Sequence, residues 1–286
     1  MGSTVRDALL WAQGLLDPDE VDVCRIEIDR LLASVLNVRR HDLYLDPGRD
    51  LSDEEKERFH FLWSERLSGR PLQHLLGETE FMSLPFRVAP GVFIPRPETE
   101  CLVEKVIDLA PQGHSTWVDI GTGAGVVAVA LAVGLPSATV IASDICGDAL
   151  RLARANAILN GVADRVRFVR ANGLTSFRHT GRVDGIVSNP PYIAEVEMEH
   201  LPAEVRNHDP LPALHGGWDG LDLIRELVSA APGILKPGGI LAMEIGETQG
   251  DAVVSLLRAG SFWRSTEIVN DLTDRPRVVV ASLDYS

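Results

Sequence analysis

Apolar residues recur at helical spacing through the first part of the chain, up to about residue 77. Three stretches show this pattern, and a capping box, Ser52-Asp53-Glu54-Glu55, opens the third. The buried face of this third helix is expected to contain four apolar residues: Phe59, Leu62, Trp63 and Leu67. We predict a small helical domain over residues 1–77. The sequence gives it no catalytic set of its own, so a structural cap and a docking surface for a macromolecular substrate both stay open.

Residues 78–96 have an extended pattern that is interrupted by turn-forming residues such as Pro85, Pro90 and Gly91. Apolar positions between these residues favour strands, so we predict a β-hairpin that links two domains. The segment ends in Arg96-Pro97, and Pro97 is well placed to open the helix that follows.

From residue 97 to residue 286, apolar runs of strand length alternate with helical stretches, which is typical of a parallel sheet. The predicted strands are 116–120, 138–143, 165–169, 183–188 and 240–245, with two more near 266–269 and 277–282. The predicted helices between them are 125–135, 148–160, 221–231 and 251–259. A turn is expected at 236–239 and a long loop at 193–217. The pattern predicts an α/β catalytic domain over residues 97–286.

Composition narrows the possible partners. The chain has 286 residues and a net charge of −14, and an acidic balance argues against a protein that grips nucleic-acid phosphates directly. No apolar run reaches membrane-spanning length. The three cysteines are far apart and the eight histidines lack a paired metal spacing, so neither a disulfide framework nor a metal site is indicated. We expect a cytoplasmic protein that acts as a monomer.

A glycine-rich stretch follows the first predicted strand of the sheet: Asp119-Ile120-Gly121-Thr122-Gly123-Ala124-Gly125. Glycines at this point let a ligand approach the backbone beside a helix N-terminus. Asp144 ends the second strand, roughly the 20 residues further on at which an acidic residue binds ribose hydroxyls in nucleoside-binding folds. Its carboxylate can accept both O–H groups of a 2′,3′-diol. Together the two features predict a cofactor that contains adenosine.

A second site follows the strand at 183–188, where the chain continues as Asn189-Pro190-Pro191-Tyr192. Two successive prolines remove two N–H donors and fix two φ angles, so the carbonyls of Asn189 and Pro190 are expected to point out of the sheet. The Asn189 carboxamide and the Tyr192 ring would converge with them. This combination predicts a receptor for a planar group with N–H donors, such as an amide or the amino group of a base.

These positions share one edge of the predicted sheet, the carboxyl ends of its strands, where open α/β sheets bind ligands. The sequence offers no nucleophilic triad, perturbed base or metal cluster nearby. Methyl transfer from S-adenosylmethionine needs none of these, because the sulfonium activates the methyl group and the site must chiefly align the nitrogen and exclude water. Our hypothesis is that Asn189 and the Pro190 carbonyl accept the N–H groups of the methylated amide, while Tyr192 stacks on it.

The chain resembles the HemK/PrmC family, the protein-(glutamine-N5) methyltransferases of peptide chain release factors. The similarity covers nearly the whole length and includes several motifs besides Asn189–Tyr192: Pro71–Gly77, Phe93–Glu100, Asp119–Gly125, Asp219–Leu221, Leu235–Gly239 and Asp274–Val278. Asn-Pro-Pro-Tyr alone is shared with DNA and RNA amino-methyltransferases. The segment Ile94-Pro95-Arg96-Pro97-Glu98-Thr99-Glu100 is much more restricted to this family.

The resemblance implies a class I, seven-stranded methyltransferase sheet that follows a helical N-terminal domain. It implies that S-adenosylmethionine is held by Gly121–Gly125 and Asp144, with Gly173 and Asn189 at the same site. It also implies that residues 189–192 hold the glutamine of a release factor's Gly-Gly-Gln motif, with the helical domain helping to dock that protein.

Two segments depart from the family's pattern. Asn172-Gly173-Leu174 stands where an acid and an aromatic residue usually frame the adenine, and Leu174 is expected to fill this edge. His208-Asp209-Pro210 replaces a Phe-Glu-Pro sequence in the loop after the motif. These departures keep open a methyltransferase of the same fold that acts on a small-molecule amide or amine. The acidic balance disfavours a nucleic-acid amino-methyltransferase, and a non-enzymatic scaffold would leave the Asn-Pro-Pro-Tyr sequence idle.

Overall fold

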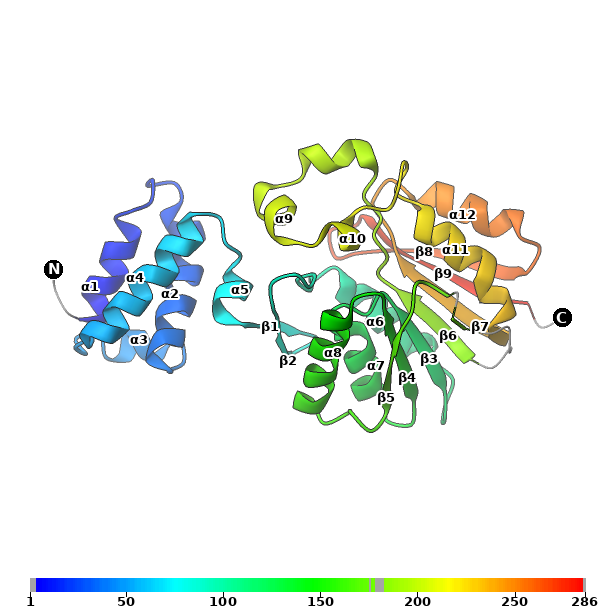
Figure 1. The fold of residues 1–286 in the computed structure, drawn as a ribbon, viewed down its shortest axis with the longest axis horizontal. Coiled ribbons are helices and arrows are strands. Elements are labelled where there is room, and N and C mark those ends of the chain that lie inside the picture. Colours follow the sequence, from blue (N-terminus) through cyan, green and yellow to red (C-terminus); the bar gives the residue numbers. More distant parts are fainter. Residues whose placement is uncertain (1–3, 175, 178–182, 285–286) are drawn as a thin grey trace. The chain divides into compact units, whose positions relative to one another are not determined.

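The structure is a computed structural model that describes residues 4–174, 176–177 and 183–284. The chain divides into two compact units, Met1–Gly77 and Glu78–Ser286 (Figure 1). The hairpin segment therefore belongs to the second unit. Within the described residues, none of the helices has the length and apolar character that crossing a membrane would require.

The first unit is helical, as the periodicity predicts. Its helices are α1 (Val5–Gln13), α2 (Val21–Leu36), α3 (Asp42–Leu45), α4 (Asp53–Leu67) and α5 (Leu72–Leu76). The capping box at the start of α4 is confirmed, because Ser52 accepts a hydrogen bond from the Glu55 N–H at 3.1 Å and the Glu55 carboxylate accepts one from the Ser52 N–H at 2.8 Å. The Trp63 indole N–H donates to the Ala12 carbonyl at 3.2 Å and so joins α4 to α1.

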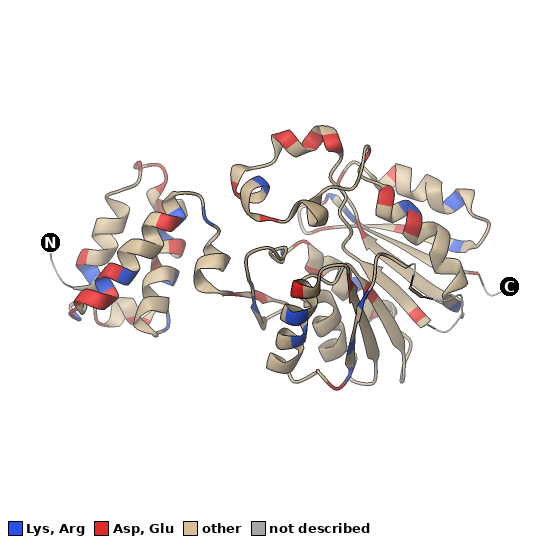
Figure 2. Ribbon diagram, viewed as in Figure 1, with Lys and Arg blue, Asp and Glu red and all other residues tan. Residues whose placement is uncertain are grey.

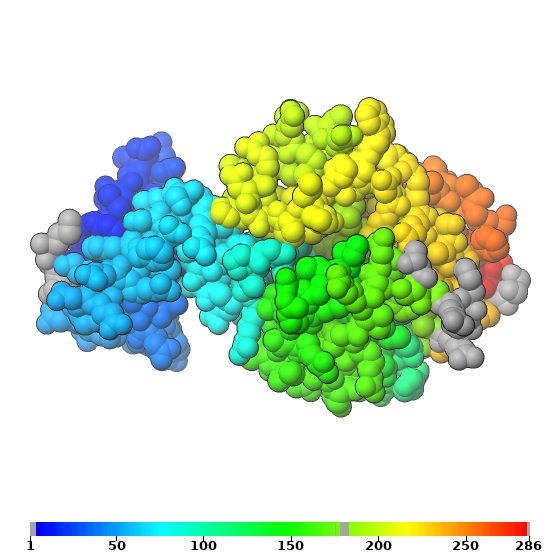
Figure 3. Space-filling view, in the orientation of Figure 1, coloured from blue at the N-terminus to red at the C-terminus, as the bar shows by residue number. Residues whose placement is uncertain are grey.

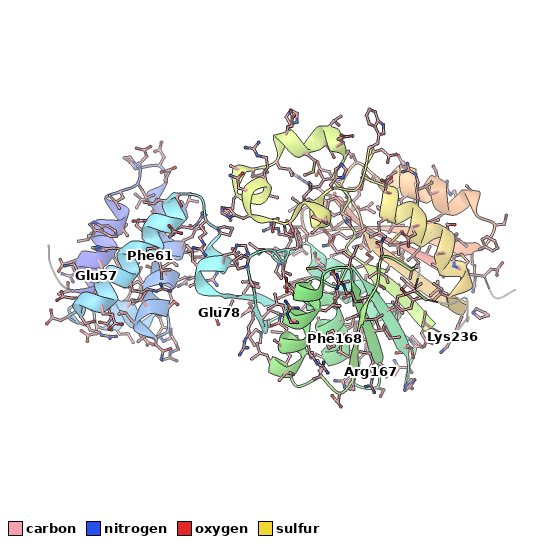
Figure 4. The ribbon with its side chains drawn as sticks, in the orientation of Figure 1. Glu57, Phe61, Glu78, Arg167, Phe168 and Lys236 are labelled. Carbon is pink, nitrogen blue, oxygen red and sulfur yellow. The ribbon has the colours of Figure 1, made fainter. Side chains whose placement is uncertain are left out.

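The predicted buried face of α4 is correct for three of its four residues. Phe59, Leu62 and Trp63 are buried, but Leu67 is 44% exposed. Leu67 is the last residue of the helix, so a turn and not a packed neighbour follows it. On the outer face of α4, Glu57 and Phe61 are both exposed and lie one turn apart (Figure 4).

The second unit begins with a hairpin that is shorter than predicted. Strands β1 (Glu78–Phe81) and β2 (Leu84–Arg87) pair through a two-residue turn, Met82 and Ser83, both of which have positive φ. Two such residues form the mirror-image turn whose twist suits a hairpin. The following helix α6 (Thr99–Leu109) begins two residues beyond Pro97, so Pro97 lies in the turn before the helix and does not open it.

The main sheet has seven strands, as the resemblance implied. They are β3 (Thr116–Ile120), β4 (Thr139–Asp144), β5 (Val166–Arg170), β6 (Val183–Ser188), β7 (Leu235–Glu244), β8 (Trp263–Asn270) and β9 (Pro276–Leu283). Their order is β5-β4-β3-β6-β7-β9-β8, and only the pairs that involve β9 are antiparallel. β5 lies at one edge, where its Arg167 is exposed and its Phe168 is half-buried (Figure 4).

Helices cover both faces of this sheet (Figure 1). Helices α6, α7 (Val126–Gly134) and α8 (Gly147–Leu159) pack on one face, and α11 (Asp222–Ala230) and α12 (Gly250–Ala259) pack on the other. The chain leaves the central strand β3 toward β4 and β5 on one side, and later continues through β6 and β7 on the other. A sheet built in this way has a crevice at the carboxyl ends of β3 and β6, where the strand order reverses.

Two segments differ from the sequence expectation. Residues 236–239 do not form a separate turn but the bulged start of β7, where the register with β6 jumps from Val183–Leu235 to Gly185–Ile240. The loop at 193–217 contains three short helices, η1 (Glu195–His200), α9 (Ala203–His208) and α10 (Leu211–Leu214). A further short helix, η2 (Ala231–Gly233), extends α11.

Gly185 is a position where the core tolerates no side chain. A Cβ atom at Gly185 in β6 would overlap the ring of Trp117, which is fully buried in the neighbouring strand β3. We expect Gly185→Ala to lower the free energy of unfolding by about 3 kcal/mol, the cost of overpacking a dense core. Urea denaturation would measure this loss. Gly48→Ala is the matched control, because a Cβ there meets nothing within 4 Å. Equal stability of the two variants would contradict the prediction.

Candidate active site

A cavity of about 520 Å³ opens at the carboxyl ends of the central strands. This volume lies within the range of small-molecule sites, roughly 300–1,000 Å³. The space-filling view shows the surface hollowed between the yellow and green segments of the second unit (Figure 3). The cavity wall includes Gly121, Asp144, Gly173 and Asn189, so the structure brings together residues that the sequence analysis assigned to one site.

The glycine-rich loop has the backbone that its sequence predicts. Gly121, Gly123 and Gly125 have φ angles of 74°, 53° and 84°, which L-residues with side chains rarely adopt. The N–H groups of Gly121 and Thr122 both donate to the Ser143 carbonyl at 2.9 Å, which ties the loop to the end of β4. Residues 121–124 line the cavity.

Gly125 serves the packing of two helices. A Cβ atom at this position would overlap Ala153 of α8, and Gly125 is not part of the described cavity wall. Its lack of a side chain therefore allows α7 to start close against α8.

Asp144 is oriented by the backbone around it. Its Oδ2 accepts the Gly123 N–H at 2.9 Å, and its Oδ1 accepts the Cys146 N–H at 2.8 Å. A carboxylate oxygen has two lone-pair directions, so each oxygen can accept one further hydrogen bond. Because Asp144 lines the cavity, this remaining capacity matches a pair of neighbouring hydroxyl groups on a ligand.

Asp119 is a buried residue that stabilises the same loop, a role that the sequence analysis did not assign. Its carboxylate is 1% exposed and accepts the Thr122 hydroxyl at 2.6 Å and the Ala128 N–H at 3.2 Å. Burial raises the pKa of Asp119 to about 7, against the effect of these two hydrogen bonds. The sequence feature that could have predicted this role is a carboxylate at the start of a glycine-rich stretch, because a residue there faces the N–H groups of the next helix.

The segment after β5 explains why glycine stands at position 173. Gly173 has a φ of 52°, and a Cβ there would overlap the Glu226 carboxylate, whose Oε1 accepts the Leu174 N–H at 2.8 Å. Asn172, Gly173 and Glu226 line the cavity. Leu174, which was expected to fill this edge, instead belongs to the core between the sheet and α11. Its apolar side chain gains more from complete burial than from a place on a cavity wall.

The Asn189 carboxamide is held by a chain of hydrogen bonds. Its Nδ2 donates to the Thr99 hydroxyl oxygen at 2.9 Å, and the Thr99 hydroxyl donates to Glu244 Oε2 at 2.7 Å. The Tyr192 hydroxyl donates to Glu244 Oε1 at 3.2 Å. In the described part of the chain, Thr99, Asn189 and Pro191 line the cavity, whereas Pro190 and Tyr192 do not.

Tyr192 therefore has a second role besides the predicted stacking. Its ring packs against the core between the sheet and α11, and its hydroxyl contacts Glu244. Burial and the nearby Glu244 charge raise the pKa of Tyr192 far above its usual value, so the phenol remains a donor. Stacking of this ring on a substrate stays a prediction.

Glu244 is a further residue near this site that the sequence analysis did not assign. It ends β7 and is 1% exposed. Burial raises the pKa of its carboxyl group to about 7, while the hydrogen bond from Thr99 and the charge of Arg277 act in the opposite direction. The signal was a single acid that directly follows the apolar run 240–243. The sequence identifies Thr99 only as part of a family motif.

The loop over the cavity is fixed by an ion pair. Asp209, whose side chain is 1% exposed, pairs with Arg96 and accepts the Ile94 N–H at 3.3 Å. The Arg96 guanidinium also lies over the Phe93 ring, 5.1 Å from its centroid. The His208-Asp209-Pro210 departure thus still provides the acid that connects this loop to the segment before α6. In the same loop, the glutamates of η1 (Glu195, Glu197 and Glu199) make the helix strongly acidic (Figure 2).

Comparison with known proteins covers both units. Residues 7–77 match the PrmC N-terminal domain, and residues 84–204 match the methyltransferase small domain. The release factor glutamine methyltransferase of Moorella thermoacetica is 41% identical over 279 residues, which covers 97% of this chain and 98% of that protein. The protein of the same name from Nitratidesulfovibrio vulgaris is 37% identical over 280 residues, with 98% and 95% covered.

Solved structures agree with the fold. A methyltransferase from Pyrococcus furiosus superposes with a TM-score of 0.53 at 16% identity, covering 80% of this chain and 98% of that chain. A ribosomal protein L11 methylase from Lactobacillus delbrueckii subsp. bulgaricus gives a TM-score of 0.50 at 21% identity, covering 70% of this chain and 85% of that chain. These likenesses concern the class I methyltransferase fold alone.

Proposed function

This chain belongs to the release factor glutamine methyltransferase family, and on that premise we propose that it methylates the side-chain amide nitrogen of a glutamine in a peptide chain release factor. The methyl donor is S-adenosylmethionine, the target is the Gly-Gly-Gln motif, and the enzyme acts in the cytoplasm. The observation that carries the proposal is the placement of the Asn189 carboxamide on the wall of the same cavity as Asp144 and the glycine-rich loop.

The cavity wall fits this donor. Asp144 keeps one free acceptor direction on each oxygen for the two ribose hydroxyls, while residues 121–124 let a ligand approach the backbone at the start of α7. Asn172 and Gly173 lie on the same wall beside the end of β5. S-adenosylmethionine, when bound, supplies a methyl group that its sulfonium has already activated.

The substrate amide is held by acceptors. On the cavity wall, the oxygen of the Asn189 carboxamide accepts one of its N–H groups and Pro191 contacts it. Although Pro190 and Tyr192 are not part of the described wall, we assign the Pro190 carbonyl to the second N–H group and the Tyr192 ring to stacking on the amide plane, as the sequence predicts. An amide nitrogen is a poor nucleophile because its lone pair is delocalised. Acceptors on both N–H groups return electron density to the nitrogen and fix its direction, and preorganised polar groups of this kind cost no reorganisation at the moment of reaction. Methyl transfer forms the N–C bond, breaks the S–CH₃ bond to leave S-adenosylhomocysteine, and releases one proton of the amide to solvent.

The helical unit has no part in this cavity, whose described wall comes entirely from residues 91–226. We assign it to docking of the release factor. Its exposed α4 face, which includes Phe61, offers apolar surface that a protein substrate can cover. In the second unit, Trp218 is 75% exposed and follows the cavity-lining residues Gly216 and Gly217, so it offers apolar surface of its own.

The test is mass spectrometry of the Gly-Gly-Gln peptide from an unmodified release factor after incubation with the full chain and S-adenosylmethionine. We expect a single added methyl group on the glutamine, with loss of the transfer in Asn189→Ala. Calorimetry with S-adenosylhomocysteine is the control for a folded cofactor site. Absence of methylation by a protein that binds this cofactor product would contradict the proposed substrate.

A further inference from the structure

The hydrogen-bond chain behind Asn189 has a definite direction. An ionised carboxylate only accepts hydrogen bonds, so Glu244 requires both Thr99 and Tyr192 to donate to it. The Thr99 hydroxyl has a single proton, and that proton is committed to Glu244. Toward Asn189, Thr99 can therefore only accept, which fits a contact made by the Nδ2 of the carboxamide.

This direction decides which end of the Asn189 carboxamide is left for a ligand. With Nδ2 bound to Thr99, the Oδ1 end is the acceptor that remains for a ligand in the cavity, which both residues line. A reversed carboxamide would present N–H groups to a substrate amide that itself brings N–H groups. Two donors that face each other in a site shielded from water are both left without an acceptor, which is costly.

We infer that Thr99 and Glu244 are positioning residues that orient the Asn189 carboxamide with its oxygen toward the substrate, and that protonation of Glu244 reverses this orientation. This inference rests on the proposed function, because it assigns Asn189 to the recognition of the substrate amide.

The reversal follows from the same rules. A protonated Glu244 can donate its own proton to Thr99, and the Thr99 hydroxyl is then free to donate to Asn189 Oδ1, which turns the carboxamide around. The titratable and charged groups that face Glu244 are Tyr192 after β6, Glu98 before α6 and Arg277 on β9. Tyr192 remains protonated and Arg277 remains charged, so neither changes over the neutral range.

The pH profile of methyl transfer follows from this geometry. Burial raises the pKa of Glu244 to about 7. The active, ionised form is lost as the pH falls through this value, so kcat/KM of the full chain is about tenfold lower at pH 6 than at pH 8. Glu244→Gln has no carboxylic acid to titrate and loses this step in the profile. Asp119, whose pKa is also raised to about 7, accepts its hydrogen bonds from Thr122 and Ala128 and keeps its titration in that variant.

Two substitutions at Thr99 separate orientation from packing. Thr99→Val keeps the shape of the side chain but removes the hydroxyl, and it lowers kcat about 10- to 100-fold and flattens the pH profile. Thr99→Ser restores the hydroxyl, so it recovers most of the lost rate and the pH step. In an Asn189→Ala background, Thr99→Val adds little further loss, because residues that act through one group are not additive. Full additivity, or a pH step in Thr99→Val as large as that of the wild type, would overturn the inference.

A second readout needs no substrate and keeps the inference testable if the proposed substrate is wrong. The side-chain NH₂ resonances of Asn189, followed by NMR between pH 5 and pH 9, titrate with Glu244 in the wild type. They lose this titration in Thr99→Val and Glu244→Gln and keep it in Thr99→Ser. A wild-type Asn189 signal that does not change with pH overturns the relay even where methylation is normal. Failure of methylation with an intact titration instead rejects the substrate and leaves the relay in place.

Discussion

Replacement of Asn189 with alanine is expected to lower kcat about 100- to 1,000-fold, the usual cost of losing a preorganised hydrogen-bonding group in an active site. The affinity for S-adenosylhomocysteine should change much less, because we propose that the glycine-rich loop and Asp144, which line the same cavity, hold the cofactor. Single-turnover methylation of the release-factor peptide would measure the rate, and calorimetry would measure the affinity.

Asn270→Ala is the matched control for this variant. It removes a carboxamide from an exposed position at the end of β8, outside the cavity wall of the described residues. We expect its rate to equal that of the wild type. Equal losses of rate and cofactor affinity in Asn189→Ala, or no loss of either, would show that Asn189 does not select the transition state.

Replacement of Asp144 with alanine should have the opposite profile. Under the proposed function the variant loses two charge-assisted hydrogen bonds to the ribose, each worth roughly 1.5–3 kcal/mol, so the Kd for S-adenosylhomocysteine should rise by at least about 100-fold. At saturating cofactor most of kcat should return, because the substrate amide is held by other residues. Calorimetry and the dependence of rate on cofactor concentration would separate the two quantities.

Two comparisons sharpen this test. Asp148→Ala removes an acid that is 68% exposed on α8 and pairs with Arg151, and it should bind the cofactor product as the wild type does. Asp144→Asn keeps one acceptor oxygen and should give an intermediate loss. An Asp144→Ala protein with wild-type affinity would place the ribose elsewhere in the cavity.

The regular elements of the second unit were predictable because each is specified locally. Strand β3 and strand β6 have the bounds that their apolar runs predict, and the other strands of the sheet lie within three residues of prediction, except that β7 begins five residues earlier than expected. A buried parallel strand needs a continuous apolar run, and a change of periodicity marks each helix. The positive φ angles at glycines 121, 123 and 125 were equally predictable, because glycine is the residue that adopts such angles without strain.

The sequence predictions were less accurate where the conformation or burial of a residue depends on what packs against it. Leu67 fits a helical stripe but is 44% exposed at the last residue of α4. Leu174 was expected at a cavity edge but is buried in the core. Residues 236–239 have the composition of a turn but continue β7 as a bulge, because β6 offers a partner on one side.

The sequence by itself determined the class of this protein: an α/β sheet with a glycine-rich loop, an acid after the second strand of the sheet and Asn-Pro-Pro-Tyr after the fourth. Only the tertiary structure decided how the site is held. Thr99 and Glu244 are 145 residues apart in the chain, and Arg96 and Asp209 are 113 apart. Such pairs form because a buried carboxylate must find hydrogen-bond donors wherever the fold brings them, and no local pattern records that requirement.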